Sequence, residues 1–106
     1  ILVLVDQEGG RVQRLRAPLA EDLPPAAALA RLYQADAARA RKLAFDIAHL
    51  CASELAAYGF NMNCAPVLDV PVDGAHDIIG DRAYGETVDQ IVDLGRAVAD
   101  GLLAGG

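Results

Sequence analysis

The stretch ILVLVDQEGG (residues 1–10) begins with five apolar residues in a row and becomes polar at Asp6. A continuous apolar run of this length is typical of a strand buried on both faces, as in a parallel sheet covered by helices. A second acid and two glycines follow at residues 8–10. Charge at the carboxyl end of a buried strand, followed by glycine, is typical of active-site loops in α/β proteins. The opening therefore predicts an α/β fold with a functional loop after its first strand.

Two long helices and a second strand are predicted further along the chain. In residues 35–58 apolar side chains recur every three or four positions, which indicates an amphipathic helix, and Gly59 is suited to end it. Thr87 and Gln90 form a capping-box pattern at the start of another apolar stripe. The expected elements, in chain order, are a strand at 1–5, a short helix at 26–33, a helix at 35–58, a strand at 60–65, a long loop at 71–85 and a helix at 87–103.

This order of strand, helix, strand and helix is typical of a parallel sheet with right-handed crossovers. Two strands do not close a core, whereas a complete (β/α) barrel takes about 250 residues. We therefore expect either that further chain supplies the rest of the sheet or that the 106 residues oligomerise. The chain begins with Ile and not Met, and it stops abruptly at Gly106. Both ends look cut, so we expect a segment of a longer protein.

The composition excludes several classes of protein. A chain that is 54% hydrophobic is not intrinsically disordered. Its net charge of −6 argues against nucleic acid or an anionic membrane as a partner. No apolar run approaches the roughly 20 residues that span a bilayer. The two cysteines, Cys51 and Cys64, are predicted to be buried free thiols of a reducing compartment. No spacing typical of metal ligands is present, so no metal is expected.

Polar residues gather at three places that follow the two predicted strands. The carboxyl ends of parallel strands meet at one rim of an α/β fold, so we expect these residues to face the same side. Carboxylates accept, and guanidinium groups donate, pairs of hydrogen bonds, which suits the hydroxyls of a sugar. The three groups are Asp6–Arg11 with Arg14, Asp69, and the loop Ile79–Gly85 with its Asp81, Arg82 and Tyr84.

Structural interpretations remain open for the first group. Asp6 could cap a following turn, and Glu8 could form an ion pair with Arg11 or Arg14. The two glycines at residues 9–10 could form only a tight turn. They do not fit a phosphate-binding glycine motif, so nucleotide binding is not expected.

The later residues have structural interpretations too. Asp69 could orient Arg82 instead of touching a ligand, and Tyr84 could pack its ring and expose its hydroxyl. His49 lies in the long predicted helix and is expected to be packed there. His76 lies in the long loop, where a lone histidine is expected to be solvated.

Three motifs together resemble a known family: DQEGGRVQRL (Asp6–Leu15), NCAPVLDV (Asn63–Val70) and IGDRAYG (Ile79–Gly85). In this order and spacing they resemble glycoside hydrolase family 3, and especially the bacterial β-N-acetylglucosaminidases (β-hexosaminidases) of peptidoglycan recycling. The resemblance implies that residues 1–106 are a partial family 3 catalytic domain, namely about two strand–helix units of a TIM-like (β/α)8 barrel. The parent would be a retaining glycosidase that needs no cofactor.

The resemblance also implies roles for individual residues. Asp6, Arg14 and Arg82 fall on sugar-binding positions of the family, and Asp69 is expected to support Arg82 without touching the sugar. The family's catalytic aspartate and histidine belong to later motifs that are not found here, so no catalytic residue is expected in this segment. Neither His49 nor His76 matches the context of the catalytic histidine. The segment alone is therefore expected to be inactive.

For the parent, the resemblance implies hydrolysis of terminal β-1,4-linked N-acetylglucosamine from muropeptides, in the cytoplasm. The remainder of the barrel would be the segment's structural partner. Two alternatives stay open. One is a family 3 β-glucosidase, and the other is a non-catalytic remnant that binds sugar without turnover.

Overall fold

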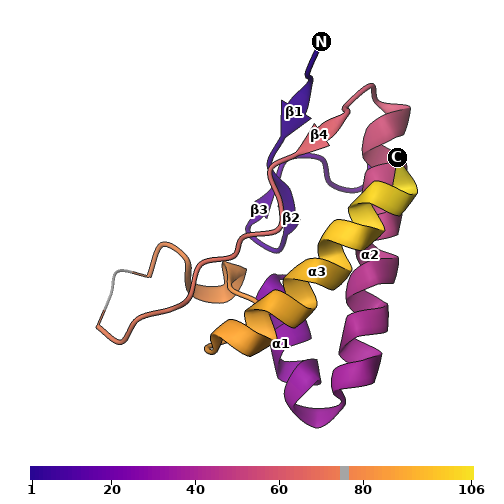
Figure 1. Ribbon diagram of the computed structural model, residues 1–106. Helices are drawn as coiled ribbons and strands as arrows, with labels where there is room; N and C mark the ends of the chain where they lie inside the picture. The colour runs from indigo at the N-terminus through magenta and orange to yellow at the C-terminus, as the bar shows by residue number, and fades with distance from the viewer. Residues whose placement is uncertain (75–76) are drawn as a thin grey trace.

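The computed structural model describes residues 1–74 and 77–106. Two long helices lie side by side, and the short strands lie next to them (Figure 1). Within the described residues, no helix has both the length and the apolar character needed to cross a membrane. The elements are β1 (Leu4–Val5), β2 (Gln7–Gly9), β3 (Val12–Gln13), α1 (Ala26–Ala35), α2 (Ala37–Ala57), β4 (Met62–Asn63), the 3₁₀ turn η1 (Gly80–Arg82) and α3 (Val88–Gly105).

β1 and β4 form a parallel pair, and α1 and α2 lie between them in the chain. Leu4 is opposite Met62 and Val5 is opposite Asn63. The predicted α/β crossover is therefore confirmed, but both strands are shorter than predicted. Within the described residues each of these two strands pairs only with the other, so regular strand hydrogen bonding is limited to the few positions where they lie side by side.

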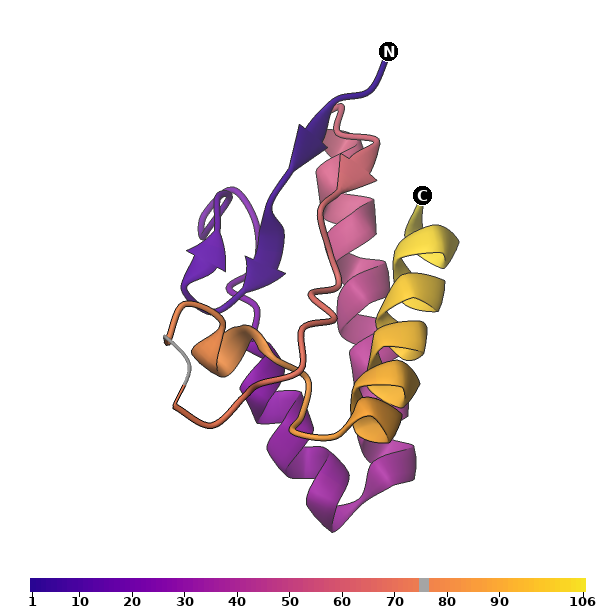
Figure 2. The same cartoon turned by 60° about the vertical axis from the view of Figure 1, so that its left-hand side comes forward.

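A β-hairpin that the sequence did not predict follows β1. β2 pairs antiparallel with β3, with Gln7 opposite Gln13 and a register shift before Gly9. Gly9 and Gly10 form the reversal with φ angles of 104° and 57°, in the region that favours glycine. The two glycines therefore turn the chain back, so the residues after Asp6 form a hairpin. Figure 2 shows this hairpin beside the turn η1.

The helix starts follow the capping signals in the sequence. Thr87 accepts a hydrogen bond from the backbone N–H of Gln90 (3.3 Å), which confirms the predicted start of α3. The predicted helix at 35–58 begins instead at residue 37, because Asp36 is extended (φ −156°) and caps α2 by accepting from the N–H of Arg39. Gly59 follows α2 with φ 89°, as its sequence position predicts.

Small residues let α2 and α3 approach closely. Ala40, Ala44 and Ala48 form a buried stripe along α2. Where α3 crosses it, a Cβ on Gly101 would collide with the carbonyl oxygen of Phe45. The helix pair therefore forms the main core, together with part of α1.

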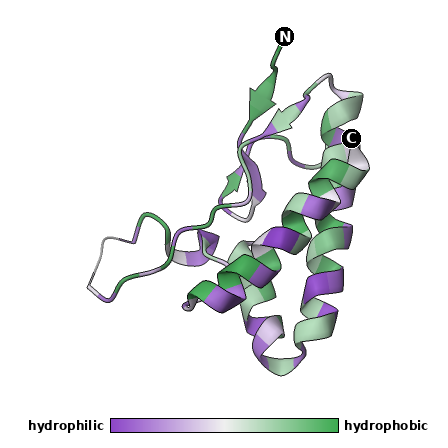
Figure 3. Cartoon of the chain, in the orientation of Figure 1, coloured by the Kyte–Doolittle hydropathy of each residue, from purple (hydrophilic) through white to green (hydrophobic). Residues whose placement is uncertain are grey.

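The strand end of the molecule is apolar but exposed. Figure 3 shows β1 as hydrophobic along its length, and Leu2 and Leu4 are 70% and 54% exposed. Met62 and Cys64, two residues apart on and just after β4, are exposed on the same face. The prediction that both cysteines are buried is therefore wrong for Cys64 and right for Cys51, which lies on α2 and packs against Val5 and Leu23.

His49 is exposed as well, which corrects the expectation that it is packed. It follows Ala48 on α2, and successive helical residues point about 100° apart, so it leaves the buried stripe. Its ring lies 6.1 Å from the ring of Phe45, centre to centre.

Candidate functional site

Two buried glutamines hold the β2–β3 hairpin from inside. The side-chain oxygen of Gln7 accepts from the N–H groups of Arg14 (2.9 Å) and Leu15 (3.1 Å). The side chain of Gln13 accepts from the N–H of Leu23 (3.0 Å) and donates to the carbonyl of Leu15 (2.8 Å). Side chains alternate along a strand, so an inward Gln7 places its neighbours Asp6 and Glu8 on the other side.

Asn63 on β4 fixes the backbone of Gln7. Its side chain accepts from the Gln7 N–H (3.0 Å) and donates to the Gln7 carbonyl (2.9 Å). One amide side chain thus satisfies both polar groups of a buried residue just past the end of the β1–β4 ladder. This contact places Asp6 and Glu8 at the carboxyl end of the strand pair.

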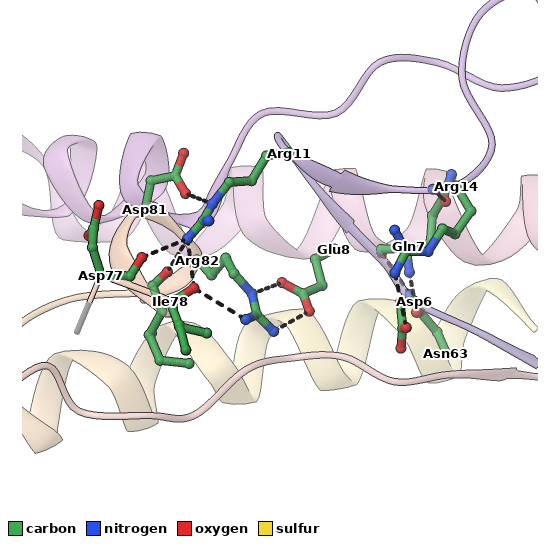
Figure 4. Close-up of polar contacts among 11 residues, drawn as sticks. Asp6, Gln7, Glu8, Arg11, Arg14, Asn63, Asp77, Ile78, Asp81 and Arg82 are labelled. Atoms are coloured by element: carbon green, nitrogen blue, oxygen red, sulfur yellow. Dashed lines mark hydrogen bonds and ion pairs between the residues drawn. The ribbon is translucent and has the colours of Figure 1, made fainter.

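Glu8 and Arg82 form an ion pair that is more buried than the pairs of Arg11 and Arg14 (Figure 4). Nε and Nη2 of Arg82 donate to the two carboxylate oxygens of Glu8, at 3.0 and 2.9 Å. The side chains are 11% exposed for Glu8 and 23% for Arg82. The hydrogen bond to Glu8 raises the pKa of Arg82, with smaller contributions from the charges of Glu8, Asp69 and Asp6.

Arg11, at the tip of the hairpin, holds the loop that carries Arg82. Its Nε donates to the Asp81 carboxylate (2.9 Å). Its Nη2 donates to three successive carbonyls, those of Asp77 (3.3 Å), Ile78 (2.7 Å) and Ile79 (3.2 Å). The guanidinium group of Arg11 thus links residues 77–81 of the loop to the hairpin by hydrogen bonds.

Asp6 and Arg14 are near each other on a more open part of the rim. Nη2 of Arg14 lies 3.4 Å from the Asp6 carboxylate, and both side chains are about half exposed (59% for Arg14, 48% for Asp6). The backbone N–H of Cys64 donates to the carbonyl of Val5, the residue before Asp6, and desolvation and then the Asp6 charge raise the pKa of the exposed Cys64 thiol. The deeper thiol, Cys51, has its pKa raised to about 11 by burial, which makes it a poor nucleophile.

The structure thus brings together Asp6 with Arg14, and Arg82 with Glu8. Of the interpretations left open for Glu8, a pairing with Arg11 or Arg14 is wrong, because these two arginines pair with Asp81 and Asp6. Asp69, the expected support of Arg82, is exposed and forms no hydrogen bond or ion pair with Arg82 in the described chain. Its influence is the smaller electrostatic one on the Arg82 pKa.

The remaining candidates fall in different environments. Tyr84 packs its ring in the core at 6% exposure, and burial raises its pKa to about 12. His76, which was expected to be solvated, lies outside the described residues. Within residues 1–74 and 77–106 no cluster of three histidine, cysteine or acidic side chains could hold a metal.

The charges of the rim suit a neutral ligand rich in hydroxyl groups. Arg11, Arg14 and Arg82 each form an ion pair with a carboxylate, so none presents an uncompensated positive charge as a phosphate site would. Paired carboxylates and guanidinium groups still offer further acceptors and donors in fixed directions.

A parallel strand pair, crossover helices, and polar side chains at the carboxyl ends of the strands define part of a parallel α/β domain, the class that includes the (β/α) barrels. The sequence profile of the glycosyl hydrolase family 3 N-terminal domain matches residues 1–105. The chain belongs to this family, as its three motifs suggest.

Similar proteins agree with this assignment. The chain is 44% identical over 102 residues to a β-hexosaminidase of Alkalilimnicola ehrlichii, covering 96% of this chain and 29% of the relative. It is 42% identical to a β-hexosaminidase of Thiobacillus denitrificans, with 96% and 28% covered. The chain thus spans less than a third of the length of these relatives.

Solved structures confirm the fold class, a fragment of a TIM-like barrel. Native NagZ from Neisseria gonorrhoeae superposes with a TM-score of 0.93 at 33% identity, over 99% of this chain and 30% of that one. The same protein was solved in complex with N-trifluoroacetyl-D-glucosamine, with the same TM-score, identity and coverage. A family 3 β-N-acetylglucosaminidase from Paenibacillus superposes with a TM-score of 0.86 at 36% identity, over 99% of this chain and 19% of that one.

Proposed function

We propose that this chain is the sugar-binding part of a retaining exo-glycosidase. The whole enzyme would hydrolyse terminal β-1,4-linked N-acetylglucosamine from peptidoglycan fragments in the cytoplasm. The observation that carries the proposal is the family 3 rim itself, with Asp6, Arg14 and Arg82 at the carboxyl end of the strand pair. The names of the relatives and the glucosamine analogue bound to a similar protein support it.

In this proposal Asp6, Arg14 and Arg82 contact hydroxyl or amide groups of the sugar. The Asp6 carboxylate accepts from hydroxyls, and the two guanidinium groups donate. Hydrogen bonds of this kind orient the sugar and tighten as charge develops in the transition state. We assign no catalytic residue to residues 1–106. The remainder of the barrel would supply the nucleophile and the acid/base of a double displacement, with no cofactor.

The test is hydrolysis by the whole protein that contains this chain. We expect release of 4-nitrophenol from its N-acetyl-β-glucosaminide in preference to its β-glucoside, and NMR should show that the sugar product keeps the β configuration. Preference for the glucoside would instead identify a β-glucosidase. Binding of N-acetylglucosamine without turnover would identify a non-catalytic remnant.

Two variants test the rim within the same assay. Asp6→Ala and Arg82→Ala should each cost about 1.5–3 kcal/mol of transition-state binding, as for hydrogen bonds to charged groups. Asp46→Ala is the matched control, because it removes an exposed carboxylate whose ion-pair partner in the described part of the chain is Lys42 on α2. An unchanged kcat/KM in both rim variants would remove the basis for the assignment.

A further inference from the structure

Arg82 lies where the local backbone does little to fix a side chain. It ends the three-residue turn η1, within the loop that connects β4 to α3. No strand ladder runs through this loop in the described part of the chain. The direction of the Arg82 guanidinium must therefore come from its side-chain hydrogen bonds, which go to Glu8 and to the carbonyl of Ile78.

The decisive contact is the carboxylate of Glu8. It occupies one edge of the planar guanidinium, the edge formed by Nε and Nη2. A weaker bond joins Nη1 to the carbonyl of Ile78 at 3.4 Å. Glu8 leaves the next edge of the group open, where one N–H of Nη1 and the second N–H of Nη2 are parallel. A bidentate partner on one edge thus sets the direction of the other.

Glu8 is itself held from both sides along the chain. Gln7, before it, has both backbone polar groups bonded to the side chain of Asn63. Gly9, after it, is packed so closely that a Cβ there would collide with the carbonyl oxygen of Pro24. A carboxylate on such a backbone, with a side chain only 11% exposed, has little freedom to reorient.

We infer that Glu8 is a positioning residue, which aims the Nη1–Nη2 edge of Arg82 at the sugar and neutralises its charge without touching the sugar. This deepens the proposed function and rests on it, because it takes Arg82 as a sugar contact. It also assigns to Glu8 the supporting role that the sequence suggested for Asp69.

A positioning role of Glu8 and a role in stabilising the hairpin have different consequences for activity. If Glu8 acts through Arg82, its removal has no further effect once Arg82 is gone. If Glu8 only stabilises the hairpin, its removal lowers activity by the same factor whether or not Arg82 is present. A double-mutant cycle separates these two cases.

The experiment measures kcat/KM and N-acetylglucosamine inhibition in the whole protein for wild type, Glu8→Ala, Arg82→Ala and the double variant. We expect Arg82→Ala to lower kcat/KM by about 10- to 150-fold, which corresponds to the loss of a hydrogen bond to a charged group. Glu8→Ala should lower it by at least tenfold, and the double variant should equal Arg82→Ala within about twofold. The inhibition constant should follow the same pattern.

Two further variants keep the test decisive. Glu8→Gln has the same shape and retains one acceptor, so it should give an intermediate loss even if Glu8→Ala folds poorly. Asp46→Asn, in the exposed pair on α2, should leave activity unchanged. Urea unfolding of each variant shows whether the fold is intact.

The possible failures are distinguishable. If Arg82→Ala leaves kcat/KM unchanged, the proposed sugar site fails and the role of Glu8 fails with it. If Arg82→Ala lowers activity but Glu8→Ala does not, or if the two effects multiply in the double variant, the sugar site stands and only the positioning role of Glu8 is overturned.

Discussion

Replacement of Asn63 by alanine should loosen the strand end that carries Asp6 and Glu8. The Asn63 side chain bonds both the N–H and the carbonyl of Gln7, at 3.0 and 2.9 Å. Gln7 is only 3% exposed, so water has poor access to these two groups once the amide is removed. Alanine therefore removes the Asn63 partner from the Gln7 N–H and leaves the Gln7 carbonyl with the longer contact from the Cys51 thiol (3.8 Å).

The expected cost follows from those two bonds. Each is worth about 0.5–1.5 kcal/mol net, and more where the remaining group stays dry. We expect Asn63→Ala to lower the free energy of unfolding by about 2–3 kcal/mol. Because Gln7 lies between Asp6 and Glu8, kcat/KM of the whole protein should fall as well.

Asn61 provides a matched control two residues earlier. Its side chain also makes one bond of each kind to the backbone, accepting from the N–H of Val3 (2.8 Å) and donating to the carbonyl of Ile1 (2.9 Å), but both bonds are exposed. Water can replace them, so Asn61→Ala should cost less than about 1 kcal/mol. Urea unfolding of both variants measures the difference. Equal losses for Asn61→Ala and Asn63→Ala would refute the argument from burial.

Three other predictions concern helix packing, thiol reactivity and acid stability. Gly101→Ala should lower the free energy of unfolding by about 1–3 kcal/mol, despite its gain of about 1 kcal/mol in helix propensity, because its Cβ would collide with the backbone carbonyl of Phe45. Gly95→Ala is the control: its Cβ would meet the flexible end of the Leu68 side chain, so urea unfolding should show it to be neutral or stabilising. Cys64 should react with an aromatic disulfide much faster than the buried Cys51, whose thiol has a pKa of about 11, and equal rates would contradict the burial. The hydrogen bond from Tyr33, and then that from Arg41, lowers the pKa of Asp93, so the stability that the Asp93 carboxylate provides is present above about pH 4 and is lost as the pH falls below that. Asp93→Asn should therefore be less stable than wild type at pH 7, and this difference should shrink in unfolding curves measured in acid.

Local signals in the sequence predicted the helices well. The apolar stripe and the glycine after it located α2, and Thr87 with Gln90 located the start of α3. These signals work because caps and stripes depend on residues within one or two turns of each other. The β2–β3 hairpin was missed because its strands are only two or three residues long and show no alternating pattern of apolar residues.

The sequence predicted which residues belong to the site but did not predict which of them form ion pairs with each other. Asp6, Arg14 and Arg82 came from motifs, and their contact with a sugar stays a prediction. The partner of Arg82 could not be read from any local pattern, because Glu8 lies 74 positions away in the chain. Asp69 was the nearer candidate in sequence, but the hairpin brings the carboxylate of Glu8 to the guanidinium instead.

The exposure of Cys64 and His49 has a similar cause. The lack of a disulfide or metal pattern suggested burial for Cys64, and its place in the amphipathic helix suggested it for His49, but burial depends on which face of a strand or helix the fold covers. Cys64 shares the open face of β4 with Met62, and His49 lies one residue off the buried stripe of α2. A sequence pattern shows that two faces differ, and only the packing of other elements shows which face is covered.

The most direct test of the account is a crystal structure of the whole protein with N-acetylglucosamine bound. The account predicts the Asp6 carboxylate and the Nη1–Nη2 edge of Arg82 within about 2.7–3.2 Å of oxygen atoms of the sugar. Glu8 should remain on the Nε–Nη2 edge of Arg82 and should not touch the ligand. A sugar bound away from Asp6 and Arg82, or a Glu8 side chain that leaves Arg82 to bind the sugar itself, would contradict the account.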